Sequence, residues 1–188
     1  MRAHVAGPVL VALMLAGCAT STLQGRDALG RGSYGEAAER FEESLAREPG
    51  RVADLIGLGI ARYKLGALDE ARAAFEEALA QRPDLPPAHL YLAMIAIRRG
   101  DAAAADTHLA RYLGLGPPPR LAAQVERARR IQASALTPDL RDYIAAALED
   151  GYQWAGEVAG AVQAARVAEW RRISDERIFL LPRYCRCR

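Results

Sequence analysis

Three cysteines and three histidines are the side chains of this 188-residue chain best suited to nucleophilic chemistry or metal binding. Cys18 follows a positive start at Arg2, an apolar run over residues 5–15 and the small pair Ala16 and Gly17. This is the layout of a secretory signal. The apolar run is too short to remain as a membrane-spanning helix. We therefore expect roughly the first 17 residues to be removable, with a thiol beside the cut.

The tetrapeptide Leu15-Ala16-Gly17-Cys18 resembles the lipobox of bacterial lipoproteins. The resemblance implies that 1–17 is a lipoprotein signal peptide and that the Cys18 thiol takes a diacylglyceryl group. The leader is then cut before Cys18 and the new α-amine is acylated, for instance with palmitate. Several acyl chains anchor a protein firmly, whereas one chain binds a membrane only marginally. Because Ala19 stands where an aspartate would resemble an inner-membrane retention signal, we expect an outer-membrane protein that faces the periplasm. The alternative is an ordinary signal peptide followed by a chance cysteine.

The remaining thiols and imidazoles give little support for catalysis. His89 and His108 have no acid or cysteine at ligand spacing, which favours packed, hydrogen-bonded histidines over a metal site. No nucleophile elbow, phosphate loop or zinc spacing occurs, so we expect neither an enzyme nor a cofactor beyond the lipid on Cys18. Cys185 and Cys187 end a basic tail over 177–188, which we expect to be disordered. They could form a local disulfide, link to another chain, act as a redox pair or be incidental.

Composition predicts one domain of tightly packed helices. The 51% of hydrophobic residues is inflated by alanine, and aromatic residues make up only 6%. The net charge of +2 comes from 25 basic and 23 acidic residues of scattered sign, so no basic footprint for nucleic acid is present.

A period of 34 residues organises the first two thirds of the chain. Prolines recur at Pro49, Pro83 and Pro117 (83 − 49 = 117 − 83 = 34). Glycines recur at 32, 66 and 100, and alanines at 37, 71 and 105, with the same period. A period of 34 is typical of helix-turn-helix units that bury their apolar faces by stacking on copies of themselves.

The units resemble tetratricopeptide repeats, most closely over residues 52–85. There the large and small positions of the repeat are filled by Leu55, Leu58, Gly59, Ala71, Phe75, Ala78 and Pro83. The departures are Arg62 where an aromatic is usual, and Ser44 and Tyr112 where alanine is usual. The resemblance implies an all-α fold, a right-handed superhelical stack of three helix pairs over 18–117 followed by C-terminal capping helices. The helices are expected near 19–31, 34–47, 52–65, 68–81, 86–99 and 102–114.

The period stops at Pro117, and residues 118–176 are predicted to form a helical cap or extension. An apolar stripe from Leu121 to Ile131 indicates one helix, and Thr137 with Pro138 indicates the start of the next. We expect a break at Asp150-Gly151 and a further helix to about residue 173. The small residues Gly156, Gly160 and Ala164 permit close helix contact, either within the chain or in a homodimer. Trp154 and Trp170 are expected to cover the core or a helix end.

The resemblance also implies a concave groove, lined by the first helix of each unit, that receives a peptide or a helix of another protein. The expected groove residues are Ile56, Ile60, Tyr63, Lys64, Leu90, Met94, Ile97 and Arg98. Carboxylate-clamp members of the family carry lysine and asparagine where this chain has Ile56 and Ile60, which disfavours capture of an acidic C-terminal peptide. We expect an interaction scaffold that is an accessory of outer-membrane assembly, secretion or pilus machinery. The alternative is a structural lipoprotein that tethers or homodimerises through its C-terminal helices while they fill the groove.

Overall fold

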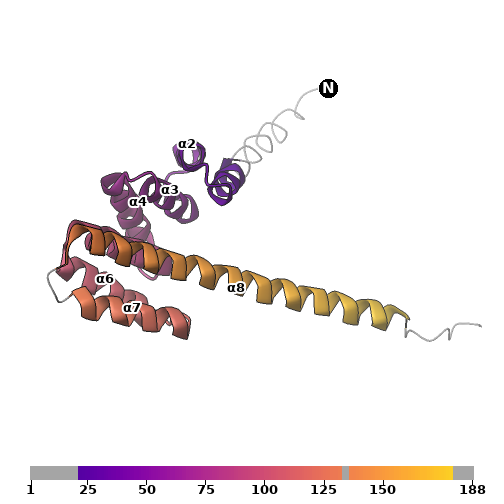
Figure 1. Ribbon diagram of the computed structural model, residues 1–188. Helices are drawn as coiled ribbons and strands as arrows, with labels where there is room; N and C mark the ends of the chain where they lie inside the picture. Colours follow the sequence, from indigo (N-terminus) through magenta and orange to yellow (C-terminus); the bar gives the residue numbers. More distant parts are fainter. Residues whose placement is uncertain (1–20, 133–135, 180–188) are drawn as a thin grey trace, which may run out of the picture.

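The computed structural model describes residues 21–132 and 136–179, and side chains within 21–131 and 136–172. Every element in these ranges is a helix, which confirms the all-α prediction (Figure 1). After a helical segment over 21–30, the helices are α2 (Tyr34–Arg47), α3 (Val52–Lys64), α4 (Leu68–Gln81), α5 (Pro86–Arg99), α6 (Ala102–Gly114), α7 (Pro119–Gln132) and α8 (Pro138–Phe179). The leader, Cys18 and the tail cysteines lie outside the described residues.

The repeating glycines mark the turn inside each helix pair. Gly32, Gly66 and Gly100 have φ angles of 75°, 79° and 77°, a left-handed conformation that residues with a Cβ atom adopt only at a cost. After the third of these turns, the Asp101 carboxylate accepts a hydrogen bond from the Ala104 N–H at 2.9 Å and caps α6. The 34-residue spacing of glycine is thus a spacing of tight turns.

The small positions of the repeat are points of close helix approach. A Cβ atom on Gly59 of α3 would lie 2.7 Å from the Phe75 ring of α4, closer than carbon atoms can pack. Ala71 and Ala105, at equivalent positions of successive second helices, have no exposed surface. These contacts confirm the repeat register that the sequence predicts.

The C-terminal extension consists of α7, which packs on α6, and α8, which packs on α7 and α5. The Leu140 N–H donates to the Thr137 hydroxyl at 3.4 Å, as expected for the start of α8. The expected break at Asp150-Gly151 is wrong, because α8 runs unbroken for 42 residues. Gly151 is instead a packing position, since a Cβ atom there would collide with the Gln124 side chain of α7.

Candidate protein-binding groove

An open hollow of about 580 Å³ lies on the concave face of the first two repeats. Its walls come from the segment 21–30, from α3 and from the start of α5. The apolar lining includes Leu29, Val52, Ile56, Ile60, Leu85 and Pro86. Ile56 and Ile60 are one helical turn apart, so their side chains lie side by side on α3. We call this hollow the open half-groove.

Arg26, Arg82 and Asp84 add charge to the open half-groove. Neither arginine forms an ion pair with a residue that the structure describes. Two free guanidinium groups beside an apolar floor suit a ligand that carries both apolar side chains and a carboxylate.

The first part of α8 covers the concave face of the third repeat. Leu90, Met94 and Ile97 of α5 are at most 1% exposed, and Ile144 and Leu148 of α8 belong to the same buried cluster. These three α5 residues cannot meet a partner while α8 stays in place. The groove is therefore divided into an open half and a half that the chain fills itself, which we call the filled half-groove.

A buried carboxylate fixes α8 in the filled half-groove. Glu149 accepts a hydrogen bond from the Tyr91 hydroxyl at 3.2 Å and lies 2.9 Å from the Lys64 ammonium. Burial, helped by the Glu149 charge, raises the pKa of Tyr91 above its usual range, so its hydroxyl stays protonated and donates. An ion pair between Arg98 and Asp142, at 3.3 Å, holds the preceding turns of α8.

Aromatic rings pack around this carboxylate. Tyr91 stacks on Phe75 at 5.3 Å between ring centres and meets Tyr63 and Tyr152 edge to face. The Arg98 guanidinium lies 4.8 Å from the centre of the Tyr63 ring. Burial raises the pKa of Tyr63 to about 12, although the nearby Arg98 charge opposes the shift.

The eight groove residues expected from the sequence thus fall into three groups. Ile56 and Ile60 line the open half-groove. Tyr63, Leu90, Met94 and Ile97 are buried. Lys64 and Arg98 pair with carboxylates of α8. The sequence pointed to neither Glu149 nor Tyr91. Glu149 was missed because the repeats, from which the groove positions were inferred, end before α8 begins.

A second buried polar cluster joins the N-terminal segment to the first two repeats. The Asp54 carboxylate, which has no exposed surface, accepts hydrogen bonds from the Ser44 hydroxyl at 2.6 Å and the Thr22 hydroxyl at 2.9 Å. Ser44 stands where the repeat usually has alanine, and this departure was the sequence signal for the cluster. Its place between three helices indicates a structural role.

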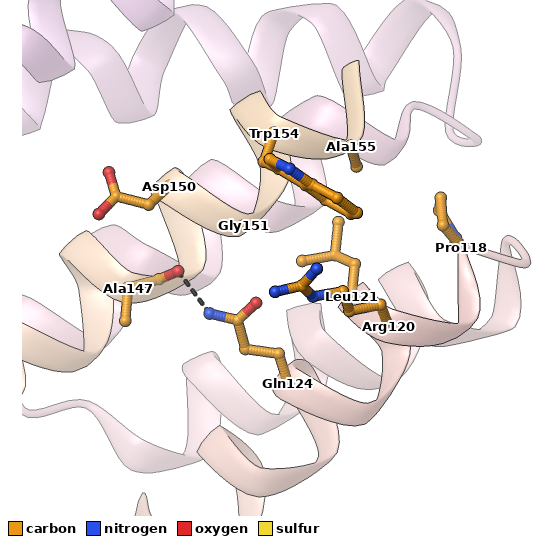
Figure 2. A pocket seen from close by; sticks show the side chains of 9 residues that line it. All are labelled: Pro118, Arg120, Leu121, Gln124, Ala147, Asp150, Gly151, Trp154 and Ala155. Carbon is orange, nitrogen blue, oxygen red and sulfur yellow. Dashed lines mark hydrogen bonds between the residues drawn. The ribbon is translucent and has the colours of Figure 1, made fainter. Parts of the chain in front are cut away.

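Two further expectations concern α8, and the structure excludes one alternative of each. Trp154 and Trp170 are 45% and 71% exposed, so neither covers the core. Gly156 and Gly160 have open space where a Cβ atom would stand, so they make no close helix contact with the described residues, and their contact in a homodimer stays a prediction. The indole of Trp154 lies over the Arg120 guanidinium of α7 at 4.3 Å, beside a shallow pocket between α7 and α8 (Figure 2).

His89 and His108 are hydrogen-bonded, as the sequence predicts, and the structure shows that they bond to each other. His89 Nε2 donates to the Pro83 carbonyl at 2.9 Å, and the two Nδ1 atoms are 3.3 Å apart, so one accepts from the other. Among the described residues no group of three or more histidine, cysteine or acidic side chains is placed to hold a metal ion.

We expect the folded protein to lose stability in mild acid because of this histidine pair. Burial and the neighbouring imidazole lower the pKa of His108, so the folded chain binds its proton less readily than the unfolded chain does. The free energy of unfolding should therefore fall as the pH drops through about 6.5, the usual histidine pKa. Urea titrations at pH 7.5 and 5.5 measure the fall, and His108→Gln should reduce it. If the free energy of unfolding of that variant falls as much as that of the parent, the assignment to His108 is wrong.

Comparison with known families identifies the type of repeat. Two models of the tetratricopeptide repeat match the chain, one over residues 22–86 and one over residues 63–128. The chain belongs to the tetratricopeptide repeat family. The CTR9 homolog of Arabidopsis thaliana is 36% identical over 73 residues, which is 38% of this chain and 7% of that protein. The chain thus spans a small fraction of that relative's length.

Solved tetratricopeptide domains share the fold. The TPR2B domain of yeast Sti1, in its pHsp70 complex, has a TM-score of 0.52 and 19% identity, over 70% of this chain and 97% of that one. The first such domain of human RPAP3 has a TM-score of 0.54 and 15% identity, and the match covers 63% of this chain and 97% of that one. An O-GlcNAc transferase of Thermobaculum terrenum has a TM-score of 0.57 and 19% identity, and the match covers 81% of this chain and 28% of that one. At these identities the likeness is one of fold.

Proposed function

We propose that this protein is a lipid-anchored scaffold of the bacterial cell envelope that binds a peptide or helix of a partner protein in its open half-groove. The observation that carries the proposal is the uncovered apolar floor around Ile56 and Ile60, next to a half-groove that already holds a helix. Apolar rows that stay uncovered in a folded chain are frequent partner sites. A role in outer-membrane assembly, secretion or pilus machinery would follow from such a scaffold.

The filled half-groove supports the proposal because it shows what this surface accepts. There α8 presents apolar side chains to the floor and carboxylates to the cationic residues Lys64 and Arg98. The open half-groove offers the same combination, with Arg26 and Arg82 as its cations. The pHsp70 and pHSP90 complexes of yeast Sti1 are in keeping with a protein or peptide partner.

Membrane attachment is the sequence-based part of the proposal. None of the described helices is long and apolar enough to cross a bilayer. A diacylglyceryl group on Cys18 would place the segment 21–30, one wall of the open half-groove, a few residues from the membrane surface. Labelled palmitate should enter the parent chain and not the Cys18→Ala variant. Absence of label in the parent would contradict the lipid anchor but would not bear on the proposed groove.

The groove is tested by photo-crosslinking in intact cells. A photoreactive amino acid at Ile56 should give a discrete crosslinked product, because that position faces the open half-groove. The same group at Ala103, on the exposed surface of α6, is the matched control and should not give that product. The product should disappear when Ile60→Asp is added. No product at Ile56, or the same product at Ala103, overturns the groove assignment.

The competing proposal is a structural lipoprotein whose groove is self-occluded. The burial of Leu90, Met94 and Ile97 under α8 favours it for the third repeat. Failure of crosslinking at Ile56, together with normal palmitate labelling, would select this second function.

A further inference from the structure

The second part of α8 extends away from the repeats, as Figure 1 shows. Every side chain from residue 156 to residue 172 is exposed. Val158, Val162 and Val167 are 41%, 48% and 43% exposed, next to the exposed Trp154 and Trp170. At 1.5 Å per residue these 17 residues form an arm about 25 Å long. We call residues 156–172 the α8 arm.

An apolar stripe of the arm continues the interface that α8 already makes with the body. Ile144 and Leu148 are buried in the core, and Ala155 packs at its edge. The same alternating spacing of three and four residues leads on to Val158, Val162 and Ala165. This spacing is the seam of a coiled coil, a stripe that pairs with another helix. No described part of the chain covers the stripe beyond residue 155, which leaves it open to a helix of another molecule.

Charge selects the pairing helix. The half of the arm near the body carries one exposed charge, that of Glu157 (−1). At the far end of the arm, Arg166, Arg171 and Arg172 with Glu169 give 3 − 1 = +2. Two copies of the arm running in opposite directions therefore place the acidic end of each against the basic end of the other. A parallel pair would place like charges together.

We propose that two copies of this chain form a homodimer by antiparallel pairing of their α8 arms. The antiparallel direction also places the two repeat domains at opposite ends of the paired arms, where they do not collide. The seam positions match when residue numbers add to 327, which places Val162 against Ala165 at the centre of the paired arms and Val158 against Glu169 at each end of the apolar seam (162 + 165 = 158 + 169 = 327). The contact is isologous, because each copy presents the same surface to the other. It leaves both open half-grooves free, so it does not depend on the proposed function.

A pair of valine variants tests the stripe. Val162 lies on the seam and Val167 lies on the opposite side of the helix, with closely similar exposure. The mature chain, carrying Cys18→Ser, Cys185→Ser and Cys187→Ser, should sediment as a dimer in analytical ultracentrifugation. Val162→Glu should weaken dimerisation by about tenfold or more, because two carboxylates enter the apolar centre of the seam, whereas Glu169 lies only at its ends. Val167→Glu should leave the dissociation constant nearly unchanged.

Crosslinking tests the direction. A mixture of Val158→Cys and Glu169→Cys chains should be joined by a short bis-maleimide, while Val158→Cys alone should not, because its two thiols would stand about 16 Å apart along the axis. Efficient linking of Val158→Cys to itself would mean parallel arms and overturn the proposal. A monomer at about 100 µM, or a dimer that Val162→Glu and Val167→Glu affect equally, would overturn it as well. Circular dichroism checks that both glutamate variants keep their helix content.

Discussion

Met94→Asp should unfold the protein or cost more than about 4 kcal/mol of stability. Met94 has no exposed surface and lies in the main apolar cluster, beneath α8. An aspartate there would lose its hydration without gaining a cation, since Lys64 and Arg98 are already paired with Glu149 and Asp142. Thermal and urea unfolding followed by circular dichroism measures the loss.

Ile56→Asp is the matched control, the same introduced charge on the equivalent helix of the preceding repeat. Ile56 lines the open half-groove and remains partly exposed, so the carboxylate can stay hydrated. Its variant should melt within a few degrees of the parent. Similar melting of the Met94 variant and the parent would mean that α8 does not cover the third repeat in solution.

Leu148→Ala should cost about 2–5 kcal/mol, as large-to-small changes in cores do. Leu148 is 1% exposed and packs in the filled half-groove, so its loss leaves a cavity between α8 and α5. The expected readout is a lower urea midpoint together with faster hydrogen exchange in α8. Val167→Ala, on the α8 arm, removes two methyl groups from an exposed position of the same helix and should change the midpoint very little. Equal midpoints for the two variants would show that the first part of α8 contributes nothing to the fold.

The repeats were predictable from the sequence because their geometry restricts residue type. A left-handed turn favours glycine at 32, 66 and 100, and a close crossing requires Gly59 opposite Phe75. Each constraint returns after 34 residues, so the sequence reveals the units and their boundaries together. The resemblance to tetratricopeptide repeats also placed Ile56 and Ile60 on the concave face.

The placement of α8 was not predictable in the same way, because nothing in the sequence repeats after Pro117. The Asp150-Gly151 pair suggested a helix break, but Gly151 is small because the Gln124 side chain occupies the space beside it. Whether Leu90 and Met94 face water or α8 depends on contacts with residues more than 50 positions away, such as Tyr91 with Glu149. A single sequence carries no signal for such a contact.

Because α8 is one unbroken helix, a rotation at one end of it moves the other end. Its first turns are seated in the filled half-groove, and its arm reaches about 25 Å further without a hinge. A tilt of about 10° at the seat would therefore move the end of the arm by about 4 Å. A ligand that loosened the seat would also displace the arm, and an arm held from outside would resist that loosening by the same free energy. One continuous helix thus joins the state of the groove to the position of a surface far from it.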